Sequence, residues 1–359
     1  MGTNVDLSVR IGTNVFANPV GVASGTFGYG GEYGGLVDFS DIGAIYTKAV
    51  TLEPRGGNPA PRLVETPSGI LNSIGLANVG VEKFISDKLP FLKSLPCAVV
   101  VNVAGSTEDE YLRVIERLES VDASDVNGNG TVSTVNLSGL LRRFAPRNDR
   151  HCERSEAIQI IDNGSIDTGG VNNNGSGVFG YEINVSCPNV NHGGLAFGTD
   201  PAQIERLTSS LRRLTKKPLI IKLTPNVTDI ATIAKAAESG GADAVSLINT
   251  LVGMVIDVKT RKPVLGAKTG GLSGPAVRPV GVALTYRVKR AVSIPVIGMG
   301  GITCADDALQ YILAGASAVQ IGTANFINPR TAGLVSAGIR EYCVNNGVSS
   351  LKDICGIVE

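Results

Sequence analysis

The sequence lacks a net charge and a long apolar run, and each absence excludes a class of protein. Its 359 residues carry 32 basic and 32 acidic side chains, so the formal net charge is zero. Nothing in this balance suggests a surface for nucleic acid or for an anionic membrane. No apolar run reaches the roughly 18 residues that a transmembrane helix needs. We therefore expect neither a nucleic-acid partner nor a membrane span.

CxxC pairs of cysteines are also missing, and we expect no secretory leader. The six cysteines, at positions 97, 152, 187, 304, 343 and 355, form no CxxC pair and show no regular spacing. The first ten residues carry charge and contain no apolar segment of the kind found in signal peptides. We expect a cytoplasmic protein with reduced thiols, and we predict no metal site.

What the sequence does contain is a series of short, apolar, β-branched runs. They span 19–25, 44–50, 97–105, 181–187, 218–224, 244–250, 294–301 and 318–324. Near-continuous hydrophobic strands of this kind are typical of a parallel sheet that is buried on both faces. Helical patterns lie between several of them, at Asp109–Leu118, Asp200–Leu214, Thr228–Ser239, Pro279–Ala291 and Ala305–Ala314, and Gly315 follows the last as a helix stop. The alternation predicts an α/β fold, a (β/α)₈ TIM barrel formed by one domain over 1–359.

Two segments make the chain longer than such a barrel requires. Glu53–Asn78 is rich in Pro and Gly and makes a long excursion after the second strand, and excursions of this length in compact domains are usually functional. Val121–Gly177 is a polar insertion before the fourth strand, rich in Asn, Gly, Ser and Asp. We expect 121–177 to be a disordered or loosely ordered surface insertion. Nothing positive supports a partner-binding role for its basic part.

Polar residues stand where the predicted strands end, and in TIM barrels these ends form the active site. They are Ser24, Lys48, Asn102, Asn184 with Cys187, Lys222, Asn249 with Thr250, Gly300 with Gly301, and Gly322 with Thr323. A strand-end lysine taken alone is often a solvated tip, but two lysines and several amides around one mouth suit a planar, anionic, hydrogen-bonding ligand. "GMGG" (298–301) and "IGTA" (321–324) follow the last two strands, where barrels often bind phosphate. Together they favour a phosphate-bearing cofactor.

Longer motifs resemble one enzyme family. "YTKAVTLEPRGGNPAPRLVETPSGILNSIGLANVG" (46–80), "NVAGS" (102–106), "NVSCPNVNHGGLAFG" (184–198), "IKLTPN" (221–226), "INT" (248–250) and "GMGG" are similar to dihydroorotate dehydrogenases of the soluble, FMN-containing class. The similarity covers essentially the whole chain except 121–177, and "ETPSGILNSIGL" is most similar to the NAD-linked type. The resemblance implies that dihydroorotate is oxidised to orotate in pyrimidine biosynthesis.

The resemblance also implies that Cys187 is the catalytic base. It would remove the C5 proton of dihydroorotate while hydride passes from C6 to FMN, which requires a lowered pKa or a positioned path for the proton. A buried, inert thiol is a better description of Cys97 and Cys304. His192 is an alternative base, although the family motif places the base at the cysteine.

Binding roles follow from the same motifs, as implications of the resemblance. Substrate contacts fall on Lys48, Asn72, Ser73, Ile74, Gly75, Leu76, Asn184, Asn249 and Thr250. FMN contacts fall on Ser24, Lys48, Ala49, Asn102, Asn184, Lys222, Ile248, Gly274, Gly300, Gly301, Gly322 and Thr323. Asparagine suits such a site because its side chain offers both donors and an acceptor, although at strand ends it is also a common turn former.

In the NAD-linked type, the catalytic chain is a homodimer core of a heterotetramer, and FAD and an iron–sulfur cluster are carried by a partner subunit. Three alternatives stay open. One is the fumarate-linked homodimeric type, which differs in its electron acceptor. Another is a reductase of other pyrimidines such as dihydrouridine in RNA, which the absence of a basic stripe disfavours. The last is a flavin-free, inactive barrel that acts as a binding protein.

Overall fold

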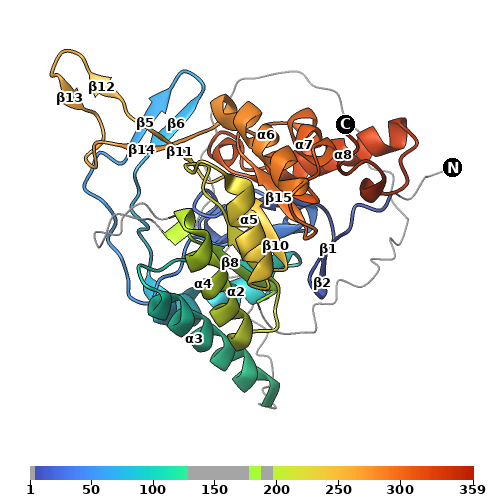
Figure 1. The fold of residues 1–359 in the computed structure, drawn as a ribbon, viewed down its shortest axis with the longest axis horizontal. Coiled ribbons are helices and arrows are strands. Elements are labelled where there is room, and N and C mark those ends of the chain that lie inside the picture. Colours follow the sequence, from blue (N-terminus) through green and yellow to red (C-terminus); the bar gives the residue numbers. More distant parts are fainter. Residues whose placement is uncertain (1–4, 128–177, 187–196) are drawn as a thin grey trace.

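Eight short parallel strands pair edge to edge and close on themselves as a barrel (Figure 1). In this computed structural model, residues 5–127, 178–186 and 197–359 are described, with backbone alone for 122–127 and 197. In chain order the barrel strands are β3 (Val20–Val22), β4 (Ala44–Tyr46), β7 (Ala98–Val103), β8 (Gly180–Asn184), β9 (Leu219–Lys222), β10 (Ala244–Leu247), β15 (Val296–Met299) and β16 (Ala318–Ile321). All eight apolar runs supply one strand each, which confirms the predicted TIM barrel.

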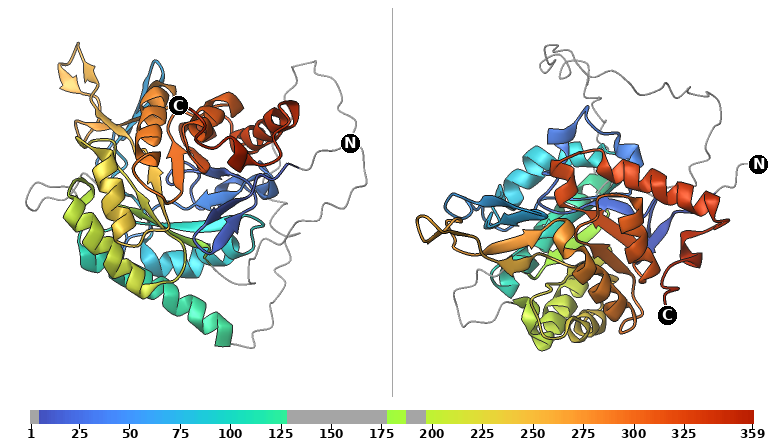
Figure 2. Two further views of the ribbon diagram at one scale, coloured as in Figure 1. Left: turned by 45° about the vertical axis from the view of Figure 1, so that its right-hand side comes forward. Right: turned by 90° about the horizontal axis from the view of Figure 1, so that it is seen from above.

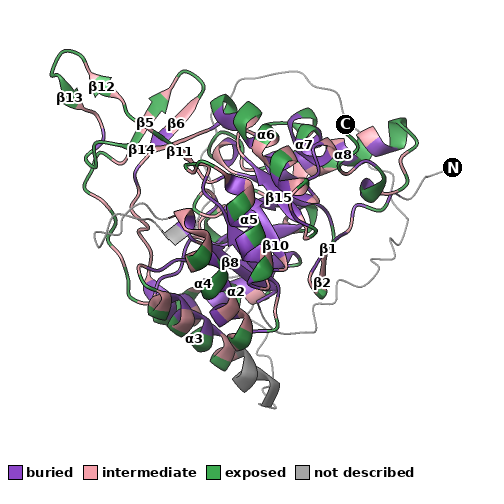
Figure 3. Cartoon of the chain, viewed as in Figure 1, coloured by how far each residue is buried: buried purple, intermediate pink, exposed green. Residues whose placement is uncertain are grey.

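The barrel strands are buried on both faces, as their composition requires. Nearly all of their residues are buried, and Figure 3 shows them as the buried centre of the molecule. One face of each strand packs in the barrel interior and the other against the surrounding helices. Space inside is tight: a Cβ at Gly21 would lie 2.8 Å from Cε2 of Tyr46, so glycine in β3 makes room for the tyrosine ring of β4.

Helices follow most of the strands and pack side by side around the barrel (Figure 2). They are α3 (Glu108–Asn127), α4 (Pro201–Leu214), α5 (Ile230–Ser239), α6 (Arg278–Lys289), α7 (Ala305–Leu313) and α8 (Thr331–Asn345). Asp200 and Asp229 cap α4 and α5, because each side chain accepts a hydrogen bond from the second helical N–H. Gly315, with φ 113°, follows α7 as predicted.

The first two crossovers are less regular. β3 is followed only by the short 3₁₀ helices η1 (Gly31–Tyr33) and η2 (Phe39–Asp41). Before β7 the chain forms α1 (Gly80–Lys83), a π-helical turn and α2 (Leu89–Lys93). Outside the barrel, β1 (Val9–Ile11) and β2 (Asn14–Phe16) form a hairpin. Four further 3₁₀ helices are η5 (Phe197–Thr199), η6 (Pro275–Val277), η7 (Thr323–Phe326) and η8 (Leu351–Asp353).

The excursion after β4 is not a simple loop. It contains β5 (Leu63–Thr66) and β6 (Gly69–Asn72), which pair with each other. β6 also pairs with β14 (Gly270–Ser273), and β14 pairs with β11 (Leu251–Gly253), which completes a four-stranded antiparallel sheet. A second hairpin, β12 (Ile256–Asp257) with β13 (Lys262–Pro263), extends from it. Figures 1 and 2 show both standing away from the helical ring at one side of the barrel.

Two sequence predictions, the burial of Cys304 and the start of the insertion, differ from the structure. Cys304 was predicted to be buried, but it is exposed, because it lies just before α7 as its N-cap residue; Cys97 is buried as predicted. The insertion was predicted to begin at Val121, yet α3 continues to Asn127. The rest of 121–177 lies outside the described residues. Within the described ranges, no helix is both long and apolar enough to cross a membrane.

Candidate active site

Two predicted amides meet where β8 and β10 end. Nδ2 of Asn249 donates to Oδ1 of Asn184 at 3.4 Å, and that oxygen also accepts from the Ser186 N–H at 3.2 Å. The Tyr111 hydroxyl donates to the Asn184 carbonyl at 2.8 Å, which anchors the strand end to α3. Oδ1 of Asn249 accepts from the Thr250 N–H. The two side chains are therefore fixed in orientation at the mouth of the barrel.

Below this mouth, a buried carboxylate occupies the barrel interior. Oε1 of Glu182 accepts hydrogen bonds from Ser246 Oγ and Gln320 Nε2, both at 2.8 Å. Oε2 accepts from Asn102 Nδ2 at 2.6 Å and lies 3.5 Å from Lys222 Nζ. We call these five residues the Glu182 network. All five are buried, and Glu182 is 0% exposed, so these four donors stabilise its buried carboxylate.

The Glu182 network holds two of the predicted cofactor residues, Asn102 and Lys222. Their side chains come from β7 and β9, the two strands that pair with β8, and both meet the same oxygen of Glu182. Oδ1 of Asn102 is buried and has no hydrogen-bond partner among the described residues. The Tyr46 ring also lies in this interior: burial first, and then the charge of Glu182, raises the pKa of Tyr46 well above its ordinary value.

Glycine backbones come close together where β14, β15 and β16 end. A Cβ at Gly301 (φ 68°) would lie 2.7 Å from the Gly274 carbonyl oxygen, so both the conformation and the approach require glycine. The Gly300 carbonyl accepts a hydrogen bond from the Tyr311 hydroxyl at 2.7 Å. Oγ1 of Thr323 donates to Ser273 Oγ at 2.9 Å. The glycine backbones and the Ser273 and Thr323 hydroxyl groups therefore lie together at these strand ends.

The excursion brings the "NSIGL" stretch to the same region. Asn72 lies at the end of β6, and its Nδ2 donates to the Gly271 carbonyl at 3.2 Å. Ser73 is buried and its Oγ has no partner among the described residues. Leu76 adopts φ 55°, an uncommon conformation for a side-chain-bearing residue.

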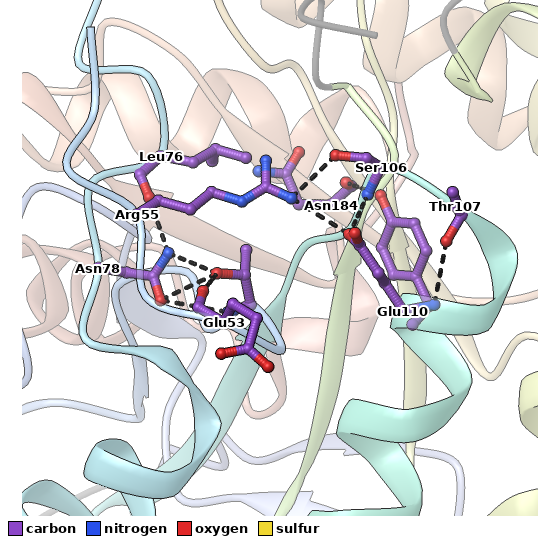
Figure 4. Close-up of polar contacts among 10 residues, drawn as sticks. Glu53, Arg55, Leu76, Asn78, Ser106, Thr107, Glu110 and Asn184 are labelled. Carbon is purple, nitrogen blue, oxygen red and sulfur yellow. Dashed lines mark hydrogen bonds and ion pairs between the residues drawn. The ribbon is translucent and has the colours of Figure 1, made fainter. Parts of the chain in front are cut away.

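A salt bridge ties this excursion to α3 (Figure 4). Nη2 of Arg55 donates to Ser106 Oγ at 2.8 Å and pairs with Glu110 Oε2 at 3.1 Å. The same Glu110 oxygen accepts from the Ser106 N–H at 2.6 Å. Close by, Asn78 Nδ2 donates to Thr51 Oγ1 and to the Leu76 carbonyl, both at 2.8 Å. The excursion is thus fastened at its base, near Asn184.

Other predicted site residues lie at the strand ends without joining these clusters. The Lys48 side chain, after β4, has no hydrogen bond or ion pair within the described part of the chain, although its N–H donates to the Gly28 carbonyl. Ser24, Ala49 and Gly322 follow their strands, and the Ile248 N–H donates to the Met299 carbonyl of β15. Cys187 and His192 lie outside the described residues, so the catalytic role of Cys187 stays a prediction.

Sequence reasoning missed several members of these clusters. Glu182, Ser246 and Gln320 carry a signal that was readable: each is a polar residue inside an otherwise apolar strand. Ser273 stands in the Gly-rich "GGLSG" stretch, so it is not a polar residue within an apolar run and gave no such signal. Arg55 and Glu110 had none either, since their pairing depends on how the excursion folds.

Comparison with known proteins gives the family. A model described as dihydroorotate dehydrogenase matches residues 6–147 and 171–342. A chain from Geotalea daltonii named "Dihydroorotate dehydrogenase B (NAD(+)), catalytic subunit" is 44% identical over 354 residues, 99% of this chain and 98% of its own length. A chain of the same name from Pelobacter propionicus is 45% identical over 354 residues, 99% of each chain. The structure of a DHODH from Eimeria tenella in complex with ferulenol, at 19% identity, shares the fold, with a TM-score of 0.68 over 98% of this chain and 88% of that one. The resemblance seen in the motifs is confirmed, and this chain belongs to the dihydroorotate dehydrogenase family.

Proposed function

We propose that this protein oxidises dihydroorotate to orotate, with FMN as the bound cofactor, in the NAD-linked branch of pyrimidine biosynthesis. The observation that carries the proposal is the 44–45% identity, over nearly the full length, to chains named as catalytic subunits of NAD(+)-dependent dihydroorotate dehydrogenase B. The architecture supports it, because many of the predicted ligand residues stand at the carboxyl ends of barrel strands, where TIM barrels have their active sites.

The residues present fit FMN. We place its phosphate at the strand ends that carry Gly274, Gly301, Ser273 and Thr323, where two hydroxyl groups come together beside glycine backbone. Oδ1 of Asn102 is buried and has no hydrogen-bond donor among the described residues. The flavin ring has an N–H between two carbonyl groups, and this N–H can donate to Asn102 Oδ1. Lys222 supplies a positive charge suited to the pyrimidine edge of the ring. Bound there, FMN supplies the two-electron acceptor for hydride from C6 of dihydroorotate.

The amides at the mouth of the barrel suit the substrate, dihydroorotate. Asn184 and Asn249 hydrogen-bond to each other, and both keep amide groups for the planar pyrimidine edge. Asn72 and the buried Ser73 come from the excursion, which Arg55 fastens to α3. A preorganised set of this kind orients the substrate and excludes water.

The proposed base is Cys187, just beyond the described end of the β8 segment. In the proposal, its thiolate takes the C5 proton and hydride leaves C6, which generates the C5–C6 double bond of orotate. Replacement of Cys187 by Ala removes the base, so flavin reduction by dihydroorotate slows by roughly 10²–10⁴-fold.

The name "catalytic subunit" of the relatives supports a second subunit for this chain. We place the FAD and the iron–sulfur cluster on that partner, with this chain forming the homodimer core of a heterotetramer. Four described cysteines are free thiols, in keeping with a cytoplasmic location.

The test is an anaerobic absorbance spectrum of the purified chain before and after addition of dihydroorotate. Flavin bands that bleach support the proposal, and NAD⁺ with the partner subunit is then compared with fumarate for reoxidation. Bands that persist contradict dihydroorotate as the substrate. A colourless protein that takes up no added FMN contradicts the cofactor and favours an inactive barrel.

A further inference from the structure

The barrel interior contains an ion pair between Glu182 and Lys222, and the proposed reaction gives a role to Lys222 but none to Glu182. In the eight described barrel strands, Glu182 and Lys222 are the only charged residues, and they are 0% and 5% exposed. Removing two charges from water is costly, and well-packed apolar side chains of similar volume are often at least as stabilising as a buried pair. Stability alone is therefore a weak reason for the pair.

The geometry shows what the carboxylate does to its neighbours. Each oxygen of Glu182 faces two donors: Ser246 and Gln320 at Oε1, and Asn102 and Lys222 at Oε2. An ionised carboxylate only accepts hydrogen bonds. Asn102 must therefore turn its NH₂ group toward Glu182, which leaves Oδ1 facing away as a free acceptor. The carboxylate also holds the Lys222 ammonium at one place at the strand end.

We propose that Glu182 is a positioning residue that acts through Lys222, offsetting part of the positive charge that Lys222 presents to the flavin and thereby holding the flavin reduction potential down. The inference rests on the proposed function, since it takes Lys222 to face FMN. When the flavin takes up two electrons and one proton, its pyrimidine edge gains a negative charge. A lysine beside that edge favours reduction, and a carboxylate 3.5 Å from the lysine opposes this effect.

The experiment measures the flavin midpoint potential against a redox dye in the FMN-loaded protein, with wild type and variants at the same pH. Glu182→Gln removes the charge and keeps the shape, so the potential rises by about 30 mV or more, a roughly tenfold change in the equilibrium of a two-electron couple. An unchanged or lower potential overturns the proposal.

Glu182→Asp keeps the negative charge but moves it away from Lys222 Nζ. The flavin potential of this variant therefore rises by less than that of Glu182→Gln. Should Glu182→Gln fail to fold, the aspartate variant carries the test, and an unchanged potential there overturns the proposal. The matched control is Asp243→Asn, which neutralises the ion pair with Arg212 at the opposite end of the barrel. This control leaves the potential unchanged; an equal rise would show a general effect of lost charge and overturn the proposal.

A double variant tests whether the effect passes through Lys222. With Lys222→Gln in place, adding Glu182→Gln shifts the potential by much less than it does when Lys222 is present. If Glu182→Gln changes the flavin potential of the Lys222→Gln protein as much as that of the wild type, Glu182 acts on the flavin directly and the assignment to Lys222 fails. The proposed function fails separately: a wild-type protein that binds FMN but is not reduced by dihydroorotate has the wrong substrate, whatever its potential. A wild-type protein that binds no FMN overturns both.

Discussion

Single thiols in this protein differ in their surroundings. Cys97 is buried before β7, and burial raises its pKa to about 12. Cys304 is exposed beside the start of α7. Because the thiolate is the nucleophile, a thiol with a pKa of about 12 is ionised in only roughly one molecule in ten thousand at pH 8.

We therefore expect iodoacetamide at about pH 8 to label Cys304 of the folded protein at least ~100-fold faster than Cys97. The measurement is the alkylation time course of each peptide by mass spectrometry. Labelling in urea is the control, since unfolding removes the burial and brings the two rates together. Equally fast labelling of both thiols in the folded protein would contradict the described burial of Cys97.

Among the elements, the excursion carries the proposed substrate contacts Asn72 and Ser73. Arg55 joins it to α3 through Ser106 and Glu110, and the side chains of Arg55 and Glu110 are 27% and 30% exposed. A partly exposed pair of this kind contributes only about 0–1 kcal/mol to global stability. Its larger effect is local, because the excursion carries Asn72 and Ser73.

Replacing Arg55 by Met frees the base of the excursion. We expect KM for dihydroorotate to rise severalfold, while kcat falls less and the melting temperature changes by only a few degrees at most. Arg113→Met is the matched control, since Arg113 also pairs with an acidic residue of α3 but at an exposed site. Steady-state kinetics with dihydroorotate provide the readout. A KM equal to that of the Arg113 variant would mean that the salt bridge does not support binding.

Sequence reasoning was most successful where the signal is local. The eight apolar runs, the helical patterns and the helix stop at Gly315 are properties of neighbouring residues, so the barrel and α4, α5 and α7 could be predicted. β6 could not, because its partner β14 is far along the chain: Asn72 bonds to Gly271 across 199 residues. The Glu182 network has the same origin, since Gln320 reaches Glu182 only when β16 and β8 face each other across a closed barrel.

At the scale of the whole molecule, buried and bonded titratable groups restrict the pH range of greatest stability. Burial raises the pKa of Asp307, but hydrogen bonds from Thr303 and the charge of Arg278 outweigh it and leave the pKa below its ordinary 3.8. A lowered carboxyl pKa stabilises the fold above the unfolded value, and this stabilisation is lost as pH falls through the folded value. Asp38 acts in the same sense through Ser40.

At the alkaline limit of stability the pKa shifts have the opposite sign. Burial raises the pKa of Cys97 from 9.0 to about 12 and that of Tyr29 from 10.0 to about 12. These groups stabilise the fold below their unfolded values, and the stabilisation is lost as pH rises from about 9 toward 12, because the unfolded chain releases its protons first. The melting temperature should therefore be flat between roughly pH 4 and pH 9 and fall on both sides.

Asp307→Asn tests the acidic limit, with the melting temperature of wild type and variant followed by circular dichroism from about pH 2 to pH 8. The variant loses the negative charge and one of the two acceptor oxygens that face Thr303 and Arg278, so above about pH 4 it melts several degrees lower. As pH falls below 4, the wild-type carboxyl is protonated and loses the same advantage, so the two curves converge. Asp257→Asn is the control, because its exposed carboxyl has a lowered pKa but only local turn contacts, and it produces a much smaller difference. Parallel curves for wild type and Asp307→Asn at every pH would show that the carboxylate charge of Asp307 does not contribute to the acidic limit.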